Sequence, residues 1–108
     1  KHRFIRASFD GLNLDIKRFW ENKYVGVDSF MAVRNSPKSI HVTAAHKVPA
    51  AFLLKRHIPQ LCQQSFVSGF LECDFTVYND QEDGVQTMEI TFDRDYVNRV
   101  MEKIFSFR

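Results

Sequence analysis

Four segments of the chain have the residue pattern of β-strands. From Phe70 to Tyr78, apolar and polar residues alternate, which predicts a strand with one buried face. Residues 79–84 are rich in Asn, Asp and Gly and predict a hairpin loop leading to a strand over Val85–Phe92. At the front, His2–Asp10 and Leu14–Val27 are rich in β-forming residues and are separated by a turn signal at residues 10–13. They predict an antiparallel hairpin with a break or bulge at residues 21–23.

Apolar residues at steps of three and four predict helices in the remaining segments. Pro49–Ser68 has this pattern, with a break expected at Pro59 and a C-cap at Gly69. Asp93 stands where an N-cap would start a final helix over residues 94–107. Short helices are predicted from residue 28 or 29 to 34 and over residues 39–47. The order β-β-α-β-β-α predicts a single α+β domain over residues 1–108, with a mixed sheet flanked by helices.

Composition excludes several classes of protein. Hydrophobic residues are 44% of the chain and include eleven phenylalanines, enough for one packed core. The formal net charge is only +2, which by itself does not indicate a nucleic-acid partner. No apolar run is long enough to predict a membrane span, and no signal-peptide pattern follows the basic start. Cys62 and Cys73 are predicted to be buried thiols, because the Cys and His spacings do not match a zinc site.

Two acids and a lysine near the front have the spacing of a metal-dependent phosphodiesterase site. Asp10 ends the first predicted strand, and Glu21 follows eleven residues later on the second. A hairpin would bring these two carboxylates side by side, and Mg²⁺ is held by one or two carboxylates plus water and phosphate. Lys23 is two residues beyond Glu21, so both side chains point to the same face of a strand. A lysine there can stabilise the charge that develops on a phosphoryl group.

The order of the short motifs resembles the lambda-exonuclease (viral recombinase) family of the PD-(D/E)xK nuclease superfamily. The segment ASFDGL at residues 7–12 is similar to the family's segment around its metal-binding aspartate, and ENK at 21–23 stands where the family has ExK. KVP at 47–49, PQLCQQ at 59–64, VSG at 67–69 and CDFTVY at 73–78 follow in the family's order. The resemblance implies a restriction-endonuclease-like core. It also implies a nuclease that resects linear double-stranded DNA for phage recombination.

The resemblance also implies roles for individual residues. Asp10 and Glu21 would bind Mg²⁺ or Mn²⁺ together with the backbone carbonyl of Asn22, and Lys23 would be the catalytic lysine. Gln60 matches the family's active-site glutamine, and Gln64, the second glutamine of that helix, is assigned to nucleic-acid binding. Further implications are a single-strand annealing protein as partner and a ring-shaped homotrimer around DNA. The implied location is the cytoplasm of a bacterial or phage-infected cell.

Four more residues are candidates for contact with nucleic acid. Lys55, Arg56 and His57 precede the predicted active-site helix segment and could clamp the phosphate backbone. Trp20 could stack on a base, although an aromatic residue on a strand more often belongs to the core.

The chain departs from the family pattern in ways that leave alternatives open. Asn22 is polar where the middle residue of ExK is usually apolar, and the family's helical region before the first strand is missing here. One rival register uses Asp15 and Lys17 as the acid and lysine. Another aligns residues 26–28 with ExK and would leave no catalytic site. The second functional hypothesis is therefore a catalytically inactive nuclease-fold protein. It would bind nucleic acid or a protein, for example to inhibit a host defence or repair complex.

Overall fold

The computed structural model describes residues 10–42 and 47–106, and these form five strands and three helices. In chain order they are β1 (Gly11–Asn13), β2 (Arg18–Tyr24), α1 (Val27–Arg34), β3 (Ser39–His41), α2 (Ala51–Ser68), β4 (Glu72–Tyr78), β5 (Val85–Thr91) and α3 (Arg94–Ser106). The strands form one sheet in the order β1-β2-β4-β5-β3. The predicted α+β class and mixed sheet are confirmed, since β1–β2 and β4–β5 pair antiparallel while β2–β4 and β3–β5 pair parallel. No helix among the described residues is long and apolar enough to cross a membrane.

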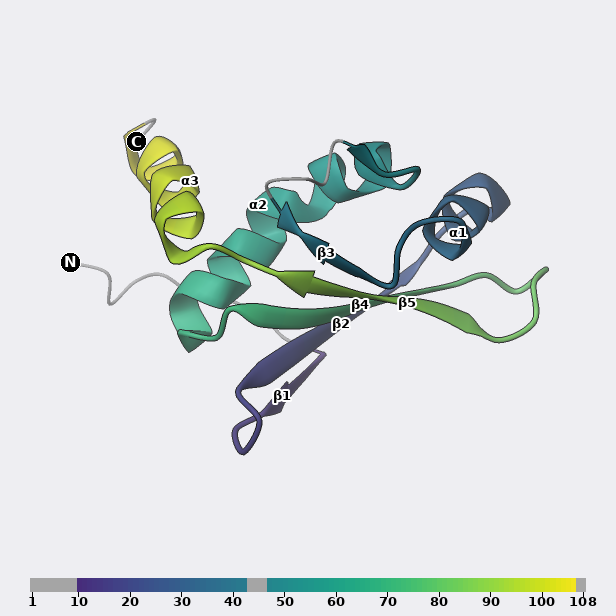
Figure 1. Ribbon diagram of the computed structural model, residues 1–108, viewed down its shortest axis with the longest axis horizontal. Helices are drawn as coiled ribbons and strands as arrows, with labels where there is room; N and C mark the ends of the chain where they lie inside the picture. Colours follow the sequence, from purple (N-terminus) through teal and green to yellow (C-terminus); the bar gives the residue numbers. More distant parts are fainter. Residues whose placement is uncertain (1–9, 43–46, 107–108) are drawn as a thin grey trace.

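The described helices gather over one face of the sheet, as Figure 1 shows. Alternate residues of each central strand are buried on that face, which is the period of two expected for a half-buried sheet. The residues buried there are Phe19 and Glu21 on β2, Cys73, Phe75 and Val77 on β4, and Met88 and Ile90 on β5. The core therefore lies between the sheet and the helices, and Glu21 is the carboxylate that faces into it.

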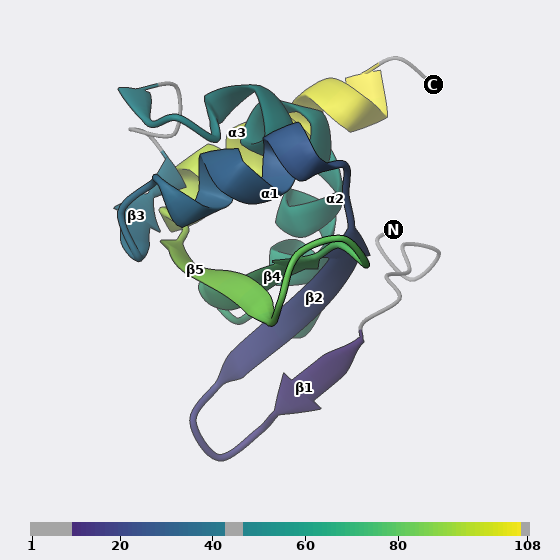
Figure 2. The same cartoon turned by 90° about the vertical axis from the view of Figure 1, so that its right-hand side faces the viewer.

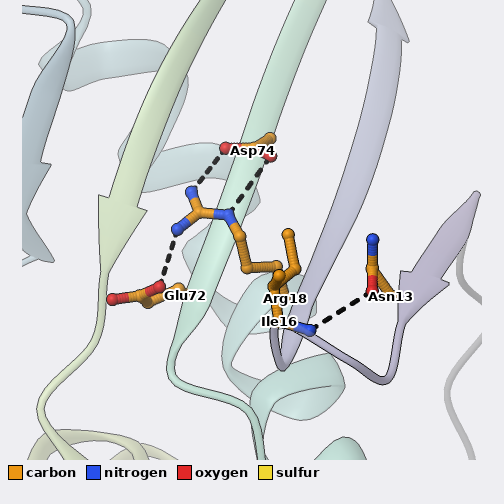
Figure 3. Close-up of polar contacts among 5 residues, drawn as sticks. All are labelled: Asn13, Ile16, Arg18, Glu72 and Asp74. Atoms are coloured by element: carbon orange, nitrogen blue, oxygen red, sulfur yellow. Dashed lines mark hydrogen bonds and ion pairs between the residues drawn. The ribbon is translucent and has the colours of Figure 1, made fainter.

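The opposite face of the sheet carries mainly polar side chains. Arg18 of β2 reaches across to β4, where its guanidinium bonds the carboxylate of Glu72 at 2.6 Å and that of Asp74 (Figure 3). Thr76 and Thr87 share a hydroxyl hydrogen bond at 2.8 Å between β4 and β5. Asn22 also points to this face, so its polar side chain is exposed.

The hairpin at the front differs from the prediction. The turn expected at residues 10–13 lies instead at residues 14–17, and residues 11–13 form β1. The side chain of Asn13 accepts the N–H groups of Asp15 and Ile16, and Lys17 has a positive φ of 57°, so this later segment makes the reversal. Most of the strand predicted over His2–Asp10 lies outside the described residues. The hairpin extends away from the helices in Figure 2.

The break or bulge predicted at residues 21–23 is wrong. Each of these three residues pairs in register with β4, so β2 is continuous. The continuous strand keeps Glu21 and Lys23 on one face, as the spacing predicted.

The helix predictions are confirmed except at two places. The helix expected to break at Pro59 is continuous as α2 and ends at Gly69, which has the predicted left-handed conformation. Pro59 is exposed, so water can reach the Lys55 carbonyl that loses its helical partner. Ser39–His41, predicted as part of a helix over residues 39–47, is an edge strand paired with β5, and residues 43–46 of that prediction lie outside the described residues. The Asp93 carboxylate caps α3 by accepting the N–H of Tyr96 at 3.2 Å.

Gly11 is required by a close contact with Trp20. A Cβ atom placed on Gly11 would lie 1.8 Å from the Trp20 indole, whereas a Cβ on Gly26 would have no atom within 4 Å. We therefore expect Gly11→Ala to lower the free energy of unfolding by roughly 1–3 kcal/mol through overpacking. Gly26→Ala is the matched control and should have little effect. Urea denaturation checks this prediction, and equal stability of the two variants would contradict it.

Candidate active site

The buried carboxylate of Glu21 is the centre of a polar cluster between β2 and α2. Glu21 is only 5% exposed. Its Oε1 accepts a hydrogen bond from Gln64 Nε2 at 2.8 Å, and its Oε2 accepts one from Gln60 Nε2 at 3.1 Å. Lys23 Nζ lies 3.2 Å from Oε2. The structure therefore brings together four residues that were singled out in the sequence, and a buried negative charge has the donors that it needs.

Asp10 joins the same cluster through the backbone of β2. Its Oδ2 accepts the N–H of Asn22 at 2.6 Å, so the carboxylate lies beside the residue that separates Glu21 from Lys23. The register explains this position, because Gly11 pairs with Trp20 and the chain continues one residue back to Asp10. The hairpin thus places Asp10 beside Asn22 of β2, although the turn lies elsewhere than predicted.

The rival registers are not brought to this place. Asp15 and Lys17 are exposed residues of the turn that follows β1. Residues 26–28 lead into α1, with Gly26 as its N-cap. Of the three registers considered, only the one with Glu21 and Lys23 places an acid and a lysine next to Asp10.

The regular periods of the two elements explain why these side chains meet. Glu21 and Lys23 are two apart on a strand and face the helices. Gln60 and Gln64 are four apart on α2 and lie on the same side of that helix. Both amides therefore point at the same carboxylate, each at a different oxygen.

Asp10 and Glu21 are the residues of this site that could hold a hard divalent cation. Mg²⁺ is commonly held by one or two carboxylates plus water and substrate phosphate, and Asp10 and Glu21 supply two carboxylates. A structural zinc site would need about four Cys, His or carboxylate ligands, and the described residues contain no group of three that could hold a metal ion. The role predicted for the Asn22 carbonyl stays a prediction.

Two of the residues predicted to bind nucleic acid lie elsewhere than expected. Gln64 is 1% exposed and its amide donates to Glu21, so its side chain points from α2 into the core. Trp20 is on the polar face of the sheet, over Gly11, whereas Glu21 is on the face beneath the helices. Lys55 and Arg56 are exposed on α2, where phosphate contact remains open to them.

His57, which the sequence places with Lys55 and Arg56 as candidates for clamping the phosphate backbone, is a neighbour of the cluster. Its ring packs against Phe75 with centroids 5.7 Å apart, and Phe75 is the register partner of Glu21 on β4. Burial lowers the pKa of His57 below its ordinary value, and the charges of Lys23 and Arg56 lower it further, while Glu21 acts in the opposite direction. His57 is one helical turn from Gln60, so the two side chains lie on the same side of α2.

The lowered pKa of His57 predicts a pH dependence of stability. Above the ordinary pKa of 6.5 the ring is neutral in both the folded and the unfolded chain. As the pH falls below 6.5, the unfolded chain binds a proton at His57 at a higher pH than the folded chain does. The free energy of unfolding therefore decreases as the pH falls toward the pKa of the folded chain. We expect the melting temperature of His57→Gln to fall less than that of wild type between about pH 7.5 and about pH 5.5. His41→Gln, at an exposed position on β3, should behave like wild type, and equal pH profiles for all three proteins would contradict the prediction.

The two cysteines are buried free thiols, as predicted. Burial raises the pKa of Cys62 to about 12 and also raises that of Cys73, so neither is a reactive thiolate near neutral pH. They belong to the core.

No family model, curated protein or solved structure matches the chain.

Proposed function

We propose that the chain is a metal-dependent deoxyribonuclease with a restriction-endonuclease-like core. The observation that carries the proposal is the contact between Glu21 and Lys23 at 3.2 Å, with Asp10 bound to the residue between them. An acid and a lysine on one strand face, with a second acid just before the paired strand, are groups that can support phosphodiester hydrolysis with a divalent cation. The order of the motifs along the chain supports the same family.

Each residue of the cluster has a distinct task in this proposal. Asp10 and Glu21 would hold Mg²⁺ or Mn²⁺, which when bound supplies Lewis-acid stabilisation of the charge on the phosphoryl group. Lys23 places a positive charge beside the reacting phosphate. Gln60 and Gln64 hold the Glu21 carboxylate in one orientation, and an orientation fixed before substrate arrives lowers the cost of reaching the transition state.

The family resemblance supports the substrate and the setting. The substrate would be linear double-stranded DNA, resected for phage recombination in the cytoplasm of an infected or lysogenic bacterium. The exposed Lys55 and Arg56 would attract its backbone. A single-strand annealing protein would take up the strand that is left, and a homotrimer would encircle the duplex.

The test is digestion of end-labelled linear duplex DNA in the presence of Mg²⁺ or Mn²⁺. We expect the wild type to cut and Asp10→Asn to lose the activity, because the second carboxylate is gone. Asp15→Asn is the matched control, as Asp15 is an acid of the same hairpin that lies in the turn. Equal cleavage by Asp10→Asn and wild type would overturn the proposed site.

A catalytically inactive binding protein of the same fold is the second candidate, and one observation favours it. The Glu21 carboxylate already accepts Lys23, Gln60 and Gln64, so the folded chain satisfies it without a cation. Melting temperatures with and without Mg²⁺ or Mn²⁺ separate the two candidates. A cation held by Asp10 and Glu21 raises the melting temperature by mass action, and an inactive cluster leaves it unchanged.

A further inference from the structure

Three side chains of α2 form a row that faces the candidate site. Gln64, Gln60 and His57 are separated by four and three residues, so they share one side of the helix. Gln64 is 1% exposed, whereas Gln60 and His57 are only partly buried. The cluster is therefore closed at the Gln64 end and opens to solvent at the His57 end.

The His57 ring stands beside the carboxylate cluster on the same face of the sheet. It packs on Phe75 at 5.7 Å, and Phe75 is opposite Glu21 in the β2–β4 register. Lys23 lies two residues further along β2 and is close enough to act on His57 electrostatically. His57 of α2 and Lys23 of β2 therefore both lie at the end of the cluster that is only partly buried. We call this end of the cluster the opening.

This opening carries positive charge. Both Lys23 and Arg56 act on His57, from β2 and from α2 respectively. Lys23 is paired with Glu21, but no carboxylate within residues 10–42 and 47–106 forms an ion pair with Arg56. Lys55 is exposed next to it. A positively charged opening attracts anions. A DNA strand presents one phosphate for the reaction, and the phosphates next to it can be bound by the surrounding side chains.

We propose that His57 is a substrate-contacting residue, whose imidazole N–H donates to a backbone phosphate of DNA at the opening between Lys23 and Arg56. This proposal rests on the proposed function, because the DNA strand that His57 would bind is the strand that would be hydrolysed at Glu21. The ordinary alternative is a histidine that only packs on Phe75.

The charges around the ring support this role. Burial, Lys23 and Arg56 lower the pKa of His57, with Glu21 opposing them, so the free protein holds a neutral ring near neutral pH. A neutral imidazole has one N–H donor, which is what a phosphate oxygen accepts. A phosphate bound there adds a negative charge next to the ring and reverses the effect of the two cations. The pKa of His57 therefore rises when DNA binds.

The experiment uses the full chain and a fluorescein-labelled duplex oligonucleotide, with Ca²⁺ as the oxygen-binding cation. Anisotropy measures the affinity, and the imidazole proton signals in NMR report the pKa of His57 with and without the oligonucleotide. We expect His57→Ala to weaken binding about tenfold, as for one hydrogen bond to a charged partner. His57→Gln, which keeps a donor, should recover part of the loss. His41→Ala is the matched control on the far edge strand and should bind like wild type.

The outcomes separate this proposal from the proposed function. If His57→Ala binds DNA as tightly as wild type, and the His57 signal of wild type does not shift on adding DNA, the role of His57 is overturned. The proposed nuclease activity is unaffected by this result if DNA is still cut. Binding that depends on His57, without any cleavage in Mg²⁺ or Mn²⁺, supports the phosphate contact and overturns the nuclease. The NMR shift is measured on wild type, so it does not depend on whether a variant folds.

Discussion

Replacing Lys23 with methionine is expected to lower the kcat of metal-dependent DNA cleavage by about 10²–10³-fold, the usual cost of removing one preorganised charge or donor at a reacting group. Methionine keeps most of the side-chain length and removes the ammonium group. Lys23 is partly exposed, so water can replace its ammonium group at Glu21 Oε2, which also keeps the hydrogen bond from Gln60. Single-turnover cleavage of end-labelled duplex DNA measures the effect on the chemical step.

The control for this prediction is Lys17→Met. Lys17 is the lysine of the rival register and lies in the turn between β1 and β2. The same substitution there should leave kcat unchanged. A loss of kcat with Lys17→Met and not with Lys23→Met would move the site to the rival register. Wild-type kcat in both variants would show that neither lysine takes part in the reaction.

The side chains of the candidate site could be predicted because they depend on short-range regularities. A period of two on β2 puts Glu21 and Lys23 on one face, and a hairpin must bring Asp10 alongside them. Gln60 came from the resemblance alone, and its bond to Glu21 joins residues 39 positions apart. What the spacing could not tell is how deeply each glutamine is buried: Gln64 is 1% exposed, whereas Gln60 is only partly buried.

The errors in the fold arise where a local signal competes with a contact made at a distance. Gly11 was interpreted as a turn residue, but it lacks a side chain because the Trp20 indole occupies that space. Residues 39–41 have a local pattern that predicts a helix, yet they pair with residues of β5 that lie fifty positions later in the chain. Pro59 was expected to break a helix, and its exposed position lets α2 continue. None of these contacts is visible in a window of neighbouring residues.

Gln64→Leu is expected to have the largest effect on stability among substitutions in the cluster. Leucine has a similar volume, but it cannot donate to the buried Glu21 Oε1, which lies 2.8 Å from the amide nitrogen. A buried acceptor that loses its donor costs roughly 1–3 kcal/mol, and more where the group is charged. The free energy of unfolding, measured in urea, should therefore fall by at least this amount.

Gln60→Leu is the matched control, because Gln60 is on the same helix and donates to the same carboxylate. It is only partly buried, so water can replace its hydrogen bond to Glu21 Oε2, and the loss should be distinctly smaller. If the two substitutions lower the free energy of unfolding equally, burial does not determine how much the Gln64–Glu21 hydrogen bond contributes to stability.

The double variant Glu21→Leu/Gln64→Leu distinguishes a carboxylate kept for chemistry from one kept for folding. Replacing both partners of a buried polar pair with apolar groups of similar shape is often neutral or stabilising. Lys23 and Gln60 are partly exposed and can turn to solvent. We expect the double variant to regain the stability that Gln64→Leu loses and to show no cleavage. If the double variant is as stable as wild type, the fold does not need the buried charge of Glu21. Glu21 is then retained for the reaction, since natural proteins accept lower stability at functional sites. A double variant less stable than either single variant would instead make the cluster part of the framework of the fold.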